Sequence, residues 1–170
     1  MRQRSSLVVH GAIAGALAAA CMTVMRMTAH RMGWIRQMVP QSVEVWALDE
    51  KLGLPRRPAA LDHLADQVLH LGYGATAGAL YAAAVGRGPR SLAGRGLGLG
   101  LPLWAFGNLV LLPGLGIAKP AWRSRPSETA VNVAAHLLYG LATALVTDEL
   151  ESQKRRQPRS YPRTRHARLG

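Results

Sequence analysis

The chain has 170 residues, a formal net charge of +12 and a hydrophobic content of 49%, values that alone would fit one soluble domain. The charges are segregated, however, because four runs of about 20 residues contain no Lys, Arg, Asp or Glu. A helix needs roughly 20 residues to cross the ~30 Å of hydrocarbon in a bilayer. The pattern excludes an ordinary soluble domain and predicts an all-α integral membrane protein, because a spanning helix satisfies its own backbone hydrogen bonds.

The predicted membrane spans are, in chain order, about 5–25, 67–86, 96–118 and 129–147. The first span has a second interpretation, because a basic start and the sequence AAAC at 18–21 resemble a secretory or lipoprotein signal. Leu17 lies one position too far from Cys21 for the lipoprotein pattern, and apolar residues continue to Met25. We therefore predict an uncleaved first span. Cys21 is the only cysteine, so no disulfide can form within the chain.

The connection after the first span contains a short amphipathic stretch at about 42–53. Val45, Trp46, Leu48 and Leu52 supply its apolar face. A helix of this kind that carries a tryptophan lies at the level of the lipid headgroups. We therefore predict an interfacial helix here.

The basic residues predict the orientation. Twelve of the 21 Lys and Arg residues lie near the two termini or between the second and third spans, and basic residues beside spans favour the cytoplasm. Both termini are therefore predicted to be cytoplasmic. Residues 1–150 form the predicted transmembrane domain, and the Arg-rich segment 151–170 forms a disordered tail attracted to anionic lipids by roughly 1 kcal/mol per charge. Tyr161 is its only aromatic residue, so no nucleic-acid partner is expected.

One phrase occurs twice, as HLGYGATAGALY at 70–81 and HLLYGLATALVT at 136–147. Spans one and three each begin with glycines four residues apart, which allow close contact between helix backbones. The predicted repeat is therefore a helical hairpin, in which a span with a glycine seam precedes a span with the repeated phrase. The positions expected to pack against other helices are Gly11, Gly15, Gly74, Gly78, Gly96, Gly100, Gly140 and Ala144.

Polar residues within the spans form the candidate site, because such residues face the interior of a bundle. The candidate interior residues are Gln67, His70, Tyr73, Asn108, Asn132, His136 and Tyr139. Gln67 and His70 share their helical face with His63 and Asp66. Hydrogen bonding across helices is the favoured interpretation, worth ~0.6 kcal/mol per contact. Two alternatives stay open: imidazoles that titrate when the outside becomes acidic, and His ligation of a metal or haem.

No metal, cofactor or catalytic activity is predicted. The histidines are not accompanied by paired cysteines, paired carboxylates or a second histidine at close spacing, so the ligand set of a metal or haem site is incomplete. The sequence also contains no GxSxG, P-loop or HExxH motif.

Several short stretches point to one family. These are LLPGLG at the end of the third span, the connection KPAWRSRPSE, the pair His136-Leu137 and the charged end TDELESQKRR. Together with the four spans, they resemble the YagU-like family of bacterial inner-membrane proteins. The resemblance covers the chain from His70 onward best, and it implies an inner-membrane helix bundle with a link to acid tolerance.

We therefore expect a small, non-enzymatic protein of the bacterial inner membrane with a structural or stress-related role. The lipid bilayer is its expected partner, and a homo-oligomer is left open. The alternative is a small transporter or channel component with its site between the second and fourth spans. Pro102 and Pro113 favour this alternative, because breaks in spanning helices mark transporter sites. A polar cavity between those two spans would favour transport, whereas tight contact between small residues would favour a scaffold.

Overall fold

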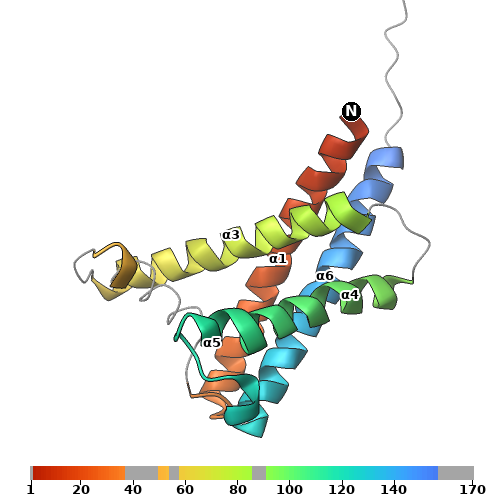
Figure 1. The fold of residues 1–170 in the computed structure, drawn as a ribbon. Helices are drawn as coiled ribbons and strands as arrows, with labels where there is room; N and C mark the ends of the chain where they lie inside the picture. The colour runs from red at the N-terminus through yellow and green to blue at the C-terminus, as the bar shows by residue number, and fades with distance from the viewer. Residues whose placement is uncertain (1, 37–49, 54–57, 86–90, 157–170) are drawn as a thin grey trace, which may run out of the picture.

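The structure is a computed structural model that describes residues 2–36, 50–53, 58–85 and 91–156. Its described residues form helices and turns without a strand, which confirms the all-α class (Figure 1). In chain order the elements are α1 (Arg2–Arg31), α3 (Ala59–Val85), α4 (Leu92–Ala105), η2 (Phe106–Leu111), α5 (Leu112–Gly114), η3 (Ala121–Arg123) and α6 (Pro126–Arg156). Most of the predicted interfacial helix at 42–53, and most of the tail at 151–170, lie outside the described residues.

The two longest helices, α1 and α6, pack against each other in antiparallel directions. At one end the hydroxyl of Ser127 in α6 donates to the carbonyl oxygen of Trp34, just after α1, at 3.0 Å. At the other end His10 of α1 contacts Glu151 of α6 at 2.7 Å. The start of α1 and the end of α6 therefore lie at the same end of the molecule (Figure 1).

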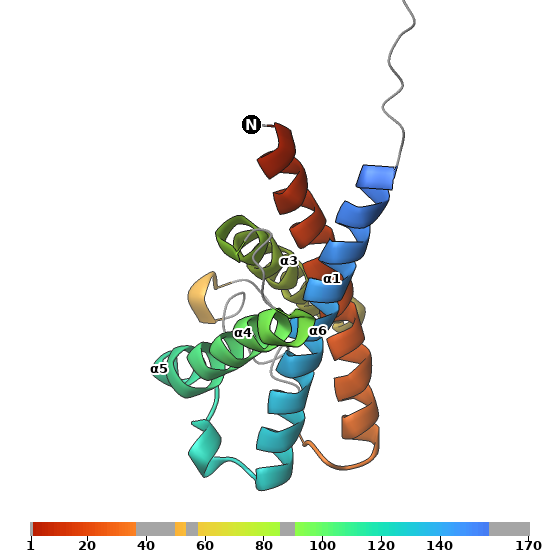
Figure 2. The ribbon, with the colours of Figure 1, turned by 90° about the vertical axis from the view of Figure 1, so that its right-hand side faces the viewer.

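The remaining long helices cross this central pair. α3 packs across α1, and α4 packs across α6, so two crossed pairs meet where α1 contacts α6 (Figures 1 and 2).

Glycines bring α1 and α3 to backbone contact. A Cβ atom placed on Gly78 would lie 2.2 Å from the carbonyl oxygen of Gly11, and one on Gly15 would lie 2.2 Å from that of Gly74. A side chain at either position would collide with the opposite backbone. Because lipid gives helices little hydrophobic reason to associate, this close van der Waals contact holds the pair together.

α4 and α6 use the same device. A Cβ atom on Gly140 would lie 2.1 Å from the carbonyl oxygen of Gly96, and one on Gly100 would lie 2.3 Å from that of His136. Ala144, one turn beyond Gly140, is also buried. The two interfaces are shifted by one helical turn relative to the repeated phrase. Gly74 contacts Gly15, the second glycine of its seam, whereas Gly140 makes its shortest contact with Gly96, the first glycine of its seam.

Small side chains dominate the core at the centre of the four helices. Its buried members are Ala18, Ala19, Met22, Ala77, Leu99, Ala135 and Tyr139. Large apolar side chains lie instead on the outer surface of all four long helices, for example Leu17, Leu80, Phe106 and Leu145. A surface of this composition suits contact with lipid.

The helix that begins as α4 does not continue regularly. Pro102 lies within it, and Phe106–Leu111 form a π-helical stretch before the short α5. The N–H of Leu112 bonds to the carbonyl oxygen of Gly107, five residues back, as in a π-helix. The next residue, Pro113, has no N–H and cannot make an α-helical hydrogen bond. The sequence prediction of a broken third span thus corresponds to a change in helix type.

A glycine in the left-handed conformation follows the end of α1, and another follows the end of α5. Gly33 after α1 has a φ of 74°, and Gly116 after α5 has a φ of 73°. In each case the N–H of the following residue returns to a carbonyl five residues back at 3.0 Å, a bond that a residue with a side chain would rarely permit.

Three described segments are long and apolar enough to cross a membrane: Ser5–Arg31, Leu92–Gly114 and Pro126–Lys154. The predicted second span, 67–86, is not among them. It lies in α3, where histidines, tyrosines and glycines stand among the apolar residues. Three such helices are therefore established where the sequence predicted four.

α6 extends beyond the predicted boundary at residue 150 and ends at Arg156. The side-chain amide of Gln153 donates to Glu149 one turn earlier at 2.9 Å, and Lys154 contacts Ser6 of α1. These contacts explain why residues 151–156, predicted to be disordered, are helical, and they correct that boundary.

The glycine contacts predict a position-specific effect of small substitutions. Gly78→Ala should lower stability by about 1–3 kcal/mol, because its Cβ has no room against Gly11. Gly72→Ala is the matched control in the same helix, since nothing lies within 4 Å of its Cβ. Thermal unfolding in detergent measures both. Equal stability of the two variants would contradict the packing of α3 on α1.

Candidate functional site

The helix bundle borders a half-open cavity of about 390 Å³, which we call the chamber. Its walls come from α1, α3, the α4–α5 segment and α6. Five of the seven predicted interior residues line it: His70, Tyr73, Asn108, His136 and Tyr139. The structure thus brings the polar residues of the two repeated phrases to one cavity.

Tyr73 and Tyr139 hold the same place in the repeated phrase but differ in environment. Tyr139 is 4% exposed, and its hydroxyl donates to the carbonyl oxygen of Gly74 at 2.6 Å. Tyr73 lines the chamber but is 52% exposed. Tyr139 therefore joins α6 to α3 at the glycine contact, whereas Tyr73 does not have this cross-helix role.

The two histidines also differ. Nδ1 of His136 lies 2.8 Å from the backbone carbonyl oxygen of Asn132. A carbonyl oxygen only accepts, so Nδ1 must donate, and the neutral ring then presents Nε2 as an acceptor. Nε2 of His70 is buried and has no hydrogen-bond partner among the described residues.

Two predicted interior residues lie away from the chamber. Gln67 does not line the chamber, but its side-chain amide donates at 3.3 Å to Asp66, which does. Asn132 lines a second cavity instead.

The sequence prediction missed two chamber residues that carry charge. Arg26 is 4% exposed and Asp66 is 2% exposed, and the two side chains interact electrostatically. Asp66 shares a helical face with His70, a signal that could have found it. Arg26 directly follows the predicted first span, 5–25, but α1 continues to Arg31 and the arginine is buried within the bundle.

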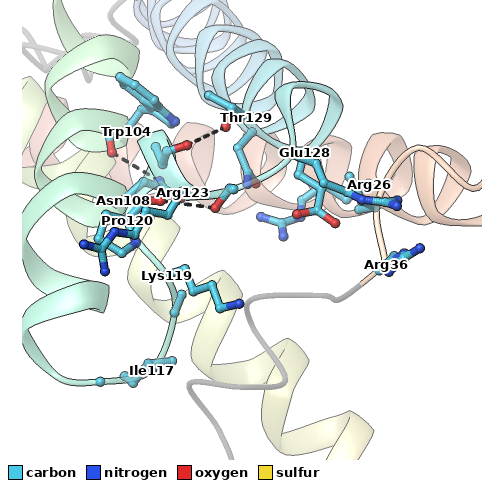
Figure 3. A pocket seen from close by; sticks show the side chains of 17 residues that line it. Arg26, Arg36, Trp104, Asn108, Ile117, Lys119, Pro120, Arg123, Glu128 and Thr129 are labelled. Carbon is cyan, nitrogen blue, oxygen red and sulfur yellow. Dashed lines mark hydrogen bonds between the residues drawn. The ribbon is translucent and has the colours of Figure 1, made fainter.

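The second cavity, which we call the vestibule, has a volume of about 730 Å³. Its lining includes five basic side chains, those of Arg26, Arg36, Lys119, Arg123 and Arg125. Among the described lining residues, Glu128 is the one carboxylate. Figure 3 shows Arg123 and Lys119, from the connection between α5 and α6, across the vestibule from Arg26 and Arg36. The vestibule is therefore strongly positive.

The two cavities share part of their walls. Arg26, Asn108 and Ile117 line both of them. Asn108 belongs to the π-helical stretch, and its side-chain amide donates to the carbonyl oxygen of Trp104 at 3.1 Å (Figure 3). A buried arginine and an amide thus stand at the junction between an apolar chamber and a basic vestibule.

Polar contacts join the helices at the opposite end, near the two chain ends. His10 of α1 donates to Glu151 of α6 at 2.7 Å, and the Ser6 hydroxyl lies 3.4 Å from the same carboxylate. Arg95 of α4 pairs with Asp148 of α6 through both of its terminal nitrogens. We call these contacts the terminal latch, because they tie α1 and α4 to α6.

A metal site would need several ligands together. Within residues 2–36, 50–53, 58–85 and 91–156, no group of three or more His, Cys, Asp or Glu side chains could hold a metal ion.

Comparison with known proteins adds nothing to this geometry, since no family model, curated protein or solved structure matches the chain.

The Tyr139 hydrogen bond predicts a measurable contribution to stability. Tyr139→Phe keeps the ring but removes the bond to Gly74, so the free energy of unfolding should fall by about 0.6 kcal/mol, and by no more than about 2. Tyr73→Phe, at the corresponding exposed tyrosine, should change stability less. Unfolding in a detergent series measures both. A larger loss for Tyr73→Phe would contradict the assignment of the cross-helix bond to Tyr139.

Proposed function

We propose that the chain is a small membrane carrier whose ligand occupies the chamber. One observation supports this most directly: the chamber adjoins a vestibule at one end of the bundle, whereas the terminal latch joins the helices at the other end. A carrier alternates between states that are open to one side and closed to the other. The observed arrangement has the form of one such state.

The cavity lies between the helices that contain the two repeated phrases. His70 and Tyr73 reach it from α3, and His136 and Tyr139 reach it from α6. The glycines make their close contacts elsewhere, between α1 and α3 and between α4 and α6. This distribution favours transport over the purely structural role that we expected first from the sequence. The two crossed pairs, each with a glycine seam, also support the proposal of a repeated hairpin.

Four crossings are part of the proposal. The antiparallel contacts between α1 and α6 leave the start of α1 and the end of α6 at one end of the bundle. If both helices cross the membrane, the total number of crossings must be even. The segment Leu92–Gly114, which comprises α4, η2 and α5, is also long and apolar enough to cross, so α3 must then cross as well.

The shape of α3 is compatible with this role. Its 27 residues span about 40 Å, more than the ~30 Å of hydrocarbon. Leu64, Val68 and Leu80 are exposed on its surface, where lipid would cover them. Glycine-mediated pairs in membranes often cross at about 40°, which two helices can share as a tilt of about 20° each.

The location also stays a proposal. The distribution of basic residues supports cytoplasmic termini, which would open the vestibule to the outer face of the membrane. The resemblance to the YagU-like family supports the bacterial inner membrane. Its implied link to acid tolerance stays a prediction, supported by the position of His70 and His136 on one cavity.

Labelling of single cysteines tests the four crossings. In a Cys21→Ser background, Cys placed at Ser91 should react with an impermeant thiol reagent from the same face as Cys at Ser152. Cys placed at Ser127 should react from the opposite face. If α3 and α4 only lie on the membrane surface, Ser91→Cys will instead react together with Ser127→Cys, and the proposed topology is wrong.

Accessibility of the chamber tests the carrier. Leu112→Cys lines the chamber, whereas Val110→Cys lies on the outer surface and is the control that lipid should protect. In oriented vesicles, Leu112→Cys should react from the vestibule face. Weakening the latch with Asp148→Asn and Glu151→Gln should raise its reactivity from the terminal face by about fivefold or more, because it favours the opposite state.

Two outcomes would contradict this proposal in different ways. If Leu112→Cys were as unreactive as Val110→Cys from both faces, the chamber would not admit a ligand. If reactivity came from the vestibule face alone, whatever the state of the latch, the protein would bind its ligand without carrying it.

A further inference from the structure

Two buried donors in the vestibule have no acceptor. Nε of Arg26 and Nε1 of Trp104 are both buried without a hydrogen-bond partner among the described residues, and both side chains line the vestibule (Figure 3). Arginine and the indole of tryptophan only donate hydrogen bonds. A buried donor without an acceptor costs free energy, so these two atoms favour a ligand with acceptor oxygens.

The charges around these donors specify the ligand further. Arg26 shares the chamber with Asp66, so its own charge is balanced within the bundle. The other four basic side chains face a single described carboxylate, that of Glu128. Among its described lining residues, the vestibule therefore has an excess of positive charge. Carboxylates and phosphates supply both the negative charge and the acceptor oxygens that such a site binds.

Apart from the polar and charged residues already named, the wall of the chamber next to this anion site is apolar. Met22, Leu69, Leu103, Leu111 and Leu112 contribute to its wall, and Ile117 belongs to both cavities. Both volumes, 390 and 730 Å³, fall within the ~300–1,000 Å³ of ligand sites in proteins. An anion that only filled the vestibule would leave the apolar chamber without a function.

We propose that the protein binds an amphipathic anion, with an acidic headgroup against Arg26 and Trp104 in the vestibule and an apolar chain in the chamber. The inference rests on the proposed function and names the class of ligand that the carrier holds. Carboxylate and phosphate headgroups share the required chemistry, so a fatty acid and a single-chain phosphate amphiphile are the two sources. Asn108 stands at the point where headgroup and chain meet.

Ligand binding can be measured on the full chain in nanodiscs of phosphatidylcholine, which carry no net charge. Four probes separate the contributions: dodecanoate, monododecyl phosphate, dodecanol and inorganic phosphate. At least one of the two amphipathic anions should raise the melting temperature in a saturable way. Dodecanol, which has the chain alone, and inorganic phosphate, which has the charge alone, should have little effect at the same concentrations. The stronger of the two anions identifies the headgroup.

Variants locate the site. The double variant Lys119→Gln with Arg123→Gln changes two exposed side chains and should weaken apparent affinity by about tenfold. Trp104→Phe removes the indole donor and should weaken it severalfold while retaining the ring. Arg31→Gln is the control, because Arg31 is exposed on α1 and lines neither cavity. These variants avoid Arg26, whose loss would leave Asp66 buried without its counter-charge.

Several results would overturn the inference. Dodecanol as effective as the anions would remove the headgroup site, and inorganic phosphate as effective would remove the role of the chamber. Equal affinity in the vestibule variants and Arg31→Gln would move binding elsewhere. Reactive Leu112→Cys without binding of either anion would reject this ligand class and leave the carrier standing. Binding without access from the terminal face would reject the carrier and leave the ligand class standing.

Discussion

The structure depends on contact between backbones where glycine replaces a side chain. Two pairs of helices approach so closely that a single added carbon at Gly78 or Gly140 would lie about 2 Å from the opposite carbonyl oxygen. Helices that touch in this way leave little room between them, so the room for a cavity lies between the two pairs. The chamber lies there, between α3 and α6, the helices that contain the two repeated phrases. The same contacts that stabilise each pair therefore determine where the chamber lies.

Charge divides the interior into two parts. The chamber, which His70 and His136 line, adjoins a vestibule with five basic side chains. Arg26 lines both cavities. A buried guanidinium is tolerated in such a place only with a partner, which Asp66 supplies from the neighbouring helix. Removal of either side chain would leave the other as an uncompensated charge. The pair therefore links the stability of the bundle to the position of the site.

Much of this architecture could be predicted from the sequence, and the failures have physical causes. Charge-free runs and glycines four residues apart predicted the helices and their contacts, because both properties depend on local spacing. Arg26 escaped notice because a charge usually ends a span, and only the continuation of α1 to Arg31 turns it inward. The vestibule is assembled from α1, α4, η2, α6 and the connection before α6, so no local sequence pattern predicts it. α3 has the length of a span but is not among the three candidate helices, and polar residues that line the chamber, such as His70, interrupt its apolar run.

The π-helical stretch at Phe106–Leu111 has a consequence for how side chains are distributed around one helix. Each residue of an α-helix advances by about 100°, so a wider turn with one residue more rotates everything beyond it by about that angle. Before the stretch, Leu97 and Leu101 are exposed on the outer surface while Leu103 lines the chamber; directly after it, Leu112 lines the chamber. A single continuous segment can thereby present one side to lipid and then another to a ligand. One additional residue in a turn therefore changes which side of this helix forms the wall of the chamber.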